Sequence, residues 1–137
     1  MIKTLISSAF LLTCAATPAG AACTQANLAG TWTAYSIGLN GNQLAWVNCN
    51  LVIGPLGAFI TQSSSCAASG QTVKVRGSLK LAAPTKCAFS GSLTIPPARG
   101  TNAIPSITLS LDKQTAAGVG GANGSGQVFT FLMVRTK

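Results

Sequence analysis

The side chains that most often do chemistry in proteins are nearly absent from this chain. Its 137 residues include no histidine and a single acidic residue, Asp112. General acid–base catalysis uses histidine or carboxylates, a nucleophilic side chain needs a neighbouring base, and catalytic metals need imidazole or several carboxylates. None of these arrangements can be assembled here. We therefore predict a protein that is not an enzyme and that holds no metal or other cofactor.

Cysteine is one reactive residue type that the chain does contain. Of five cysteines, Cys14 lies in a segment that we expect to be removed, which leaves Cys23, Cys49, Cys66 and Cys87. No two of these four have the C-x2-4-C spacing of structural zinc sites, and four cysteines in an oxidising compartment predict two disulfides. Of the three pairings we favour Cys49–Cys66, which would bridge neighbouring strands, together with Cys23–Cys87, which would tie down the N-terminus.

The start of the chain has the features of an export signal. Lys3 precedes an apolar run from Leu5 to Ala16, and the stretch from Ala19 to Ala22 offers the small residues of a cleavage site. The apolar run is shorter than the ~20 residues that a membrane-spanning helix needs, and no later stretch approaches that length. We therefore predict an exported protein, periplasmic or secreted, that does not span a membrane.

Removal of residues 1–22 as a signal peptide leaves residues 23–137, enough for one domain that buries roughly two-thirds of its unfolded surface. No linker or internal repeat marks a second domain. Cleavage directly before Cys23 would also allow a lipid to be attached to this cysteine. That alternative is disfavoured because Gly20 stands where the bacterial lipoprotein signal has leucine.

Alternation with a period of two residues dominates the rest of the sequence and predicts β-strands. Between Cys87 and Ile95, apolar residues alternate with serine and threonine. In the segment from Val73 to Leu81, every second residue is apolar, and Lys74, Arg76 and Lys80 fall on the other face. Serine and threonine are expected to cover most of the outer surface. Further strands are expected at 31–37, 44–53, 58–64, 106–111, 116–120 and 127–135.

Short turns rich in glycine, proline and asparagine separate these strands, as at Asn40-Gly41 and Gly54-Pro55. Short connections favour antiparallel neighbours, and a meander that closes on itself has no unpaired edges. We predict an all-β fold, an antiparallel up-and-down barrel of about eight strands, with a β-sandwich as the alternative. The interior of such a barrel is just wide enough to be filled by side chains or to hold one small ligand.

The first expected strand opens with Gly30-Thr31-Trp32, and the last one ends on the basic residue Arg135. A Gly-x-Trp opening with a basic residue at the end of the last strand resembles the calycin superfamily of small β-barrels. This superfamily includes lipocalins, avidins and small periplasmic inhibitors of bacterial metalloproteases. The resemblance implies that Trp32 closes the barrel floor and that Arg135 packs across it in a cation–π contact.

The stretch from Trp46 to Leu51, followed by Cys66, is similar to the inhibitor branch, in which a cysteine pair bridges early strands. In that branch an N-terminal arm enters the protease cleft. Here only residues 23–29 precede Gly30, and a disulfide at Cys23 would hold them back. The aromatic-rich pocket of the avidins is not visible either, so the resemblance does not imply biotin binding.

Basic residues are the other group that could carry function. The chain contains nine lysines and arginines, so loss of Lys3 leaves eight against one acidic residue and a net charge near +7. Lys74, Arg76 and Lys80 share the outer face of one expected strand and are our candidate surface for an anionic partner. Suitable partners are an acidic polysaccharide, lipopolysaccharide or an acidic protein. Nucleic acid is disfavoured, because no exposed aromatic residue alternates with these cations to stack on bases.

Two classes of function fit this sequence. The first is an exported interaction module, of which an inhibitor-like protein is one form, that docks on a macromolecule through its loops or through the cations. The second is a carrier of a small apolar ligand in the barrel interior. Bulky residues such as Phe89, Leu93, Leu109 and Leu111, with either Phe129 and Phe131 or Leu132 and Val134, are expected inside. This bulk favours the interaction module. A third interpretation is that the cations only keep the barrel soluble and protect it from pairing with other chains.

The cysteine assignment predicts that the exported protein contains no free thiol. Alkylation under denaturing conditions followed by mass spectrometry should leave the mass unchanged without a reductant and add four labels after reduction. Two labelled cysteines in the unreduced protein would contradict the disulfide assignment.

Overall fold

The computed structural model describes residues 22–40, 43–68, 70–96, 101–122 and 127–137. Residues 1–21, which contain almost all of the expected export signal, lie outside this set, so signal cleavage stays a prediction. The described chain is almost entirely β-structure. Two short 3-10 helices, η1 (Gln25–Leu28) and η2 (Pro84–Lys86), are the only helical elements in the described ranges.

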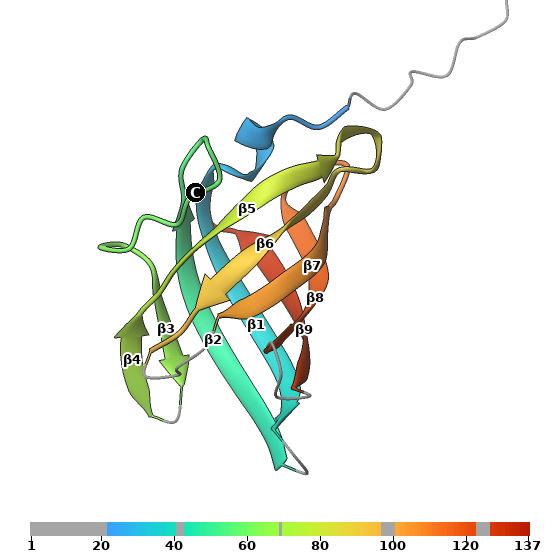
Figure 1. Cartoon of the computed structure of the whole chain (residues 1–137). Helices are drawn as coiled ribbons and strands as arrows, with labels where there is room; N and C mark the ends of the chain where they lie inside the picture. Colours follow the sequence, from blue (N-terminus) through green and yellow to red (C-terminus); the bar gives the residue numbers. More distant parts are fainter. Residues whose placement is uncertain (1–21, 41–42, 69, 97–100, 123–126) are drawn as a thin grey trace, which may run out of the picture.

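Nine strands form one antiparallel sheet that curls into a barrel (Figure 1). The barrel prediction is confirmed, and the β-sandwich alternative is wrong. The sheet order is β4-β3-β2-β1-β9-β8-β7-β6-β5, so the first and last strands pair in the middle of the sheet. The strands are β1 (Gly30–Asn40), β2 (Gln43–Ile53), β3 (Ser65–Ala68), β4 (Gln71–Lys74), β5 (Arg76–Ala83), β6 (Ala88–Thr94), β7 (Asn102–Leu109), β8 (Thr115–Ala122) and β9 (Val128–Arg135).

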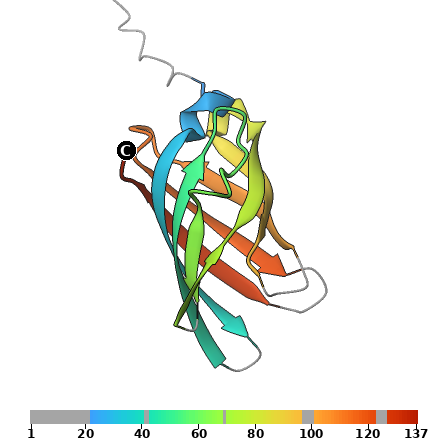
Figure 2. The same ribbon diagram turned by 90° about the vertical axis from the view of Figure 1, so that its left-hand side faces the viewer.

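The two ends of this sheet are joined by the chain itself. β4 and β5 are separated only by Val75, yet β4 pairs with β3 while β5 pairs with β6. The strand expected from Val73 to Leu81 is therefore one extended segment that bends at Val75 and counts as two strands. With β3, which was not expected, in place of the strand expected at 58–64, the sheet has nine strands instead of about eight. The quarter-turn view in Figure 2 shows the segment leaving one side of the barrel and continuing along the other.

The prediction of a strand from Ala58 to Ser64 is wrong. Only isolated bridges form there, Ala58 to Ser78 and Ile53 to Phe59, and a turn follows them. The backbone N–H of Phe59 donates to the carbonyl of Gly77 at 2.9 Å, so this short stretch pairs with β5. The chain then has to turn back toward β3, and the hydroxyl of Ser64 holds this return by bonding to the backbone of Val52.

Trp32 and Arg135 close one end of the barrel. Trp32 is fully buried, its indole N–H donates to the carbonyl of Leu28 at 2.8 Å, and the guanidinium carbon of Arg135 lies 4.4 Å from its ring centre. Arg135 also donates to the carbonyls of Asn27 and Ala29 in and beside η1. A Cβ on Gly30 would lie 2.6 Å from the arginine, and the φ of Gly30 is +134°, so only glycine fits in front of this contact.

Two disulfides cross-link the barrel, one at the end closed by Trp32 and one between β2 and β3. Cys23 bonds to Cys87, which ties the residues before η1 to the start of β6, and the backbone N–H of Cys23 also donates to the carbonyl of Pro84. Cys49 and Cys66 are directly paired residues of β2 and β3 and form the second disulfide. These are the pairings that the sequence favoured, and two disulfides indicate an oxidising compartment.

The glycines of β8 leave room for two aromatic rings on the inner side of the sheet. Gly118 pairs with Phe131 and Gly120 pairs with Phe129. A Cβ on Gly120 would lie 2.3 Å from the Phe129 ring, and one on Gly118 would lie 2.8 Å from the Phe131 ring. Phe129 and Phe131 therefore point inward, which decides between the two alternations left open for the last strand.

One residue expected in the core lies outside it. Leu111 is 90% exposed, because β7 ends at Leu109 and the chain turns before the next inward position. The hydroxyl of Ser110 sets this turn by donating to the Asp112 carboxylate and accepting from the backbone N–H of Thr115 at 3.0 Å. The buried core consists of apolar residues from all the strands except β3 and β4, together with the cysteines, Leu28, Phe59 and Val75.

The two tryptophans allow a matched test of the closing contact. Trp32→Ala should lower the free energy of unfolding by ~3–5 kcal/mol, the usual result of deleting a buried large aromatic side chain. In dilute solution, where the barrels are monomeric, Trp46→Ala should change it by less than ~0.5 kcal/mol, because this side chain is 71% exposed. Urea denaturation followed by circular dichroism measures the free energy of unfolding of both variants. Equal decreases would show that Trp32 does not stabilise the barrel more than an exposed tryptophan does.

Candidate interaction surfaces

The first candidate surface is the cationic strand, defined as Lys74, Arg76 and Lys80 on the β4–β5 segment. All three side chains are exposed and point outward, while Val75 and Leu79 between them are buried. Their spacing along the segment is roughly 7 Å for Lys74 to Arg76 and 13 Å for Arg76 to Lys80. The structure therefore brings the three predicted residues together on one outer face.

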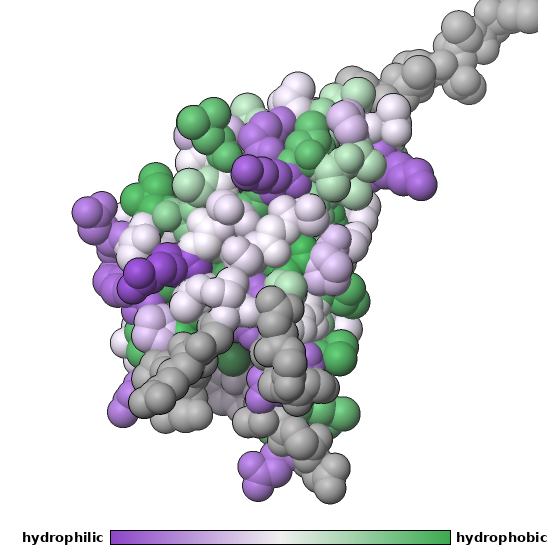
Figure 3. Space-filling model, viewed as in Figure 1, coloured by the Kyte–Doolittle hydropathy of each residue, from purple (hydrophilic) through white to green (hydrophobic). Residues whose placement is uncertain are grey.

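Only small polar residues neighbour these cations on β6. Arg76 pairs with Thr94, Lys80 pairs with Ser90, and Ser78 between them pairs with Ser92. Lys74 additionally donates from its ammonium group to the carbonyl of Gln62 at 2.6 Å. In Figure 3 the face formed by β5, β6 and β7 is mostly pale or purple, which marks weakly to strongly hydrophilic residues.

The only acidic side chain of the chain is engaged elsewhere. Asp112 lies in the turn between β7 and β8, where its carboxylate accepts hydrogen bonds from the Ser110 hydroxyl and from the backbone N–H of Gln114. These bonds lower the pKa of Asp112, the Ser110 hydroxyl being the larger cause. The described residues contain no group of three or more side chains that could hold a metal ion.

The opposite side of the barrel has a different surface, which the sequence did not predict. On β1, β2, β8 and β9 the outward residues are largely apolar, and among the residues of these four strands only Arg135 is charged. We call this surface the apolar face. Its large apolar members, exposed over 37% to 71% of their surfaces, are Tyr35, Ile37, Leu39, Leu44, Trp46, Val119, Val128, Leu132 and Val134. The expectation that serine and threonine cover the outer surface holds for β5, β6 and β7 but is wrong here.

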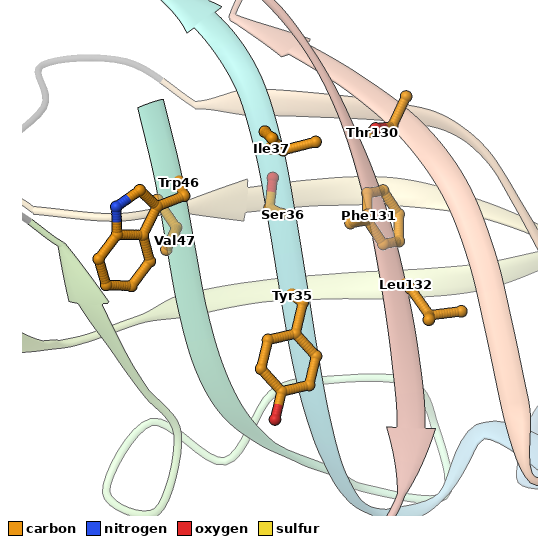
Figure 4. Close-up of a pocket in the computed structure, with 8 residues that line it drawn as sticks. All are labelled: Tyr35, Ser36, Ile37, Trp46, Val47, Thr130, Phe131 and Leu132. Carbon is orange, nitrogen blue, oxygen red and sulfur yellow. The ribbon is translucent and has the colours of Figure 1, made fainter. Parts of the chain in front are cut away.

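Strand pairing arranges these side chains in rows with a groove between two of them (Figure 4). One row is formed by Trp46, Ile37 and Thr130, which are cross-strand neighbours. The next row contains Tyr35 and Leu132. The backbone of the inward-pointing row between them forms the floor of the groove, which has a volume of about 400 Å³.

This groove lies on the outside of the barrel. Its lining residues come only from three adjacent strands, β2, β1 and β9, and none comes from the strands across the interior. Two of the residues that flank it, Trp46 and Tyr35, are also the most exposed aromatic side chains of the described chain. The groove is therefore part of the apolar face and not an entrance to the core.

The sequence could not reveal the apolar face because both alternations of the first strand are apolar. Trp32 and Ala34 point inward, and Tyr35, Ile37 and Leu39 point outward. A period of two residues identifies the buried side of a strand only when the other side is polar. A usable signal was the absence of charge from the first, second and last strands apart from Arg135.

Comparison with known proteins supports the barrel fold and identifies no family. No family model matches the chain, and no curated protein matches it. Among solved structures, a redesigned β-barrel is similar, with a TM-score of 0.60 and 14% sequence identity over 82% of this chain and 95% of that chain. An identity this low establishes a shared barrel fold alone. In the part of the chain that the structure describes, no helix is long and apolar enough to cross a bilayer.

With a single carboxylate side chain, the stability of this protein should depend little on pH. Because the folded pKa of Asp112 is lowered, its contribution is present above the unfolded pKa of ~3.9 and is lost as the pH falls through the folded value. With no histidine to titrate, the urea midpoint should be flat from about pH 5 to pH 8. Below pH 5 the urea midpoint should fall slightly, and Asp112→Asn should make this fall smaller. A steep loss above pH 5, or an acid slope unchanged by this substitution, would contradict the assignment.

Proposed function

We propose that this protein is an exported, non-enzymatic binding module that docks on an anionic macromolecule through the cationic strand. The observation that carries this proposal is the placement of Lys74, Arg76 and Lys80 on one outer face, where the paired residues of β6 are serine and threonine. A side chain that only kept the protein soluble could lie anywhere on the surface. Three cations without an acidic neighbour form a local positive field that attracts a polyanion and speeds its association.

The surroundings of the cationic strand favour a polysaccharide, lipopolysaccharide phosphate or an acidic protein surface over nucleic acid. Single-stranded nucleic acids are held by cations combined with aromatic side chains on which the bases stack. Here the exposed aromatic residues, Tyr35 and Trp46, lie on β1 and β2, away from the cationic strand. No exposed aromatic residue of the described strands therefore alternates with these cations to stack on bases.

Membership of the calycin superfamily is part of this proposal. It is supported by the Gly-x-Trp opening of β1 and by the contact between Trp32 and Arg135. An inhibitor of the arm-insertion type is disfavoured, because Cys23 is bonded to Cys87 and η1 is held by Arg135. Docking through the outer surface of the strands does not require the N-terminal residues to leave the barrel.

A carrier of a small apolar ligand in the interior is the alternative, and the packing favours the docking module over it. Phe89, Ile107 and Trp32 are fully buried in the described core, and the rings of Phe129 and Phe131 lie against the inner glycines of β8. The groove of about 400 Å³ opens on the outside. These observations favour a packed interior over a ligand cavity.

Charge reversal tests the proposal. The purified protein should be retained on an immobilised polyanion and released by modest salt, because screening weakens surface charges as the Debye length falls to ~8 Å at physiological ionic strength. The triple variant Lys74→Glu, Arg76→Glu, Lys80→Glu should lose this retention and keep the melting temperature of the unchanged protein within a few degrees.

The matched control reverses three other cations by Arg99→Glu, Lys113→Glu and Lys137→Glu, so the net charge changes by the same amount. This control should keep most of its retention. If both triple variants lose retention equally, the cations act only through net charge, and the proposed binding surface is wrong. Retention that survives both changes would contradict an electrostatic partner altogether.

A further inference from the structure

The apolar face is too large to be an ordinary part of a monomer surface. Its nine large apolar side chains, at ~100 Å² exposed on each, amount to roughly 900 Å², whereas the largest apolar area on a typical monomer is ~300–600 Å². A standard-size protein interface takes ~800 Å² from each partner. The face is therefore large enough to bury in one stable interface.

The distribution of charge identifies the kind of partner. The sheet order places β1 and β9 in the middle and β4 and β5 at the two ends, so the cationic strand lies on the opposite side of the barrel from the apolar face. Figure 1 shows this arrangement, with β5, β6 and β7 in front and β1, β2 and β9 behind. A protein that binds an anionic lipid surface carries cations and apolar groups on the same side, and one that binds a polyanion carries cations there. The apolar face instead suits a partner that is itself uncharged and apolar.

A second copy of this chain has such a surface. Each mature copy carries a net charge near +7, so two copies repel one another in most orientations. When the two apolar faces meet, the cationic strands are as far apart as the barrels allow. This is the orientation in which the copies bury most apolar area with least repulsion.

The shape of the apolar face fits the same partner. The row containing Trp46 and Ile37 forms a ridge, and the groove runs directly beside it. In a two-fold symmetric dimer each copy contributes the same surface, so the ridge of one copy can enter the groove of the other in both directions. Trp46, which is 71% exposed, is the side chain best placed to fill the groove of the partner.

We propose that two copies of this protein associate through the apolar faces to form a symmetric dimer, with the two cationic strands on its outer sides. This inference goes beyond the proposed function and does not depend on it. A dimer would present two cationic surfaces pointing in opposite directions, so it could bridge two anionic chains or two segments of one long chain.

Sedimentation equilibrium of the purified, oxidised protein tests this proposal. At roughly 100 µM, where a Kd of ~1 µM leaves few monomers, the mass should be twice that of one chain. Added salt should strengthen the association, because it screens repulsion between the copies and leaves apolar burial intact. Polyanion binding has the opposite salt dependence, so the two interactions can be told apart in one preparation.

Leucine substitutions provide a matched pair of variants. Leu44→Glu changes a residue of the apolar face that is 68% exposed, and Leu56→Glu changes one outside it that is 84% exposed. The first variant should raise the dissociation constant at least ~10-fold and the second should leave it unchanged. Val128→Glu, on β9, should repeat the result of Leu44→Glu. Melting temperatures confirm that all the variants fold.

Three results would overturn the proposal. The first is a single-chain mass at every concentration, and the second is equal weakening of the dimer by Leu44→Glu and Leu56→Glu. The third is binding of the unchanged protein to phosphatidylcholine vesicles that is lost in Leu44→Glu, which would assign the apolar face to a lipid surface.

Discussion

The contact between Trp32 and Arg135 is the constraint on which the rest of the barrel depends. It joins the first strand to the last one and fixes their register, in which Trp32 pairs directly with Arg135. The same guanidinium holds η1 through the carbonyls of Asn27 and Ala29 and the β7–β8 turn through the carbonyl of Lys113. Because every donor of Arg135 that bonds here is directed at a backbone carbonyl, a single cation stabilises one closed end without a buried counter-charge.

Closure at that end, together with the aromatic rings on the inner side of β8, favours the outside of the barrel as the place where this protein acts. Phe129 and Phe131 occupy the space that Gly118 and Gly120 leave on the inner side of β8. The outer surface then divides into two halves, because β5, β6 and β7 carry cations, serine and threonine whereas β1, β2, β8 and β9 carry almost no charge. Two surfaces of opposite character on one small barrel are suited to two different interactions, one electrostatic and one apolar.

The parts of this structure that were predictable from the sequence are those in which one face of a strand is clearly polar. Val75, Leu79, Phe89 and Leu93 alternate with polar residues, and their strands and inward faces follow directly. Prediction was wrong where that contrast is missing or where a turn intervenes. β1 is apolar on both sides, so its outward face was not recognised, and Leu111 lies past the end of β7 because of the Ser110 hydrogen bonds. Lys74, Arg76 and Lys80 lie on the outer face as expected, because buried apolar residues alternate with them along the β4–β5 segment.

The division of the outer surface into an apolar and a cationic half can be tested directly by nuclear magnetic resonance. Amide chemical shifts of the ¹⁵N-labelled protein can be followed during dilution and, separately, during addition of a soluble polyanion. We expect dilution to change the amide shifts of β1, β2, β8 and β9, and the polyanion to change those of β4, β5 and β6. Changes that coincide on one set of strands in both titrations, or that cluster at inward-facing core residues, would contradict this division.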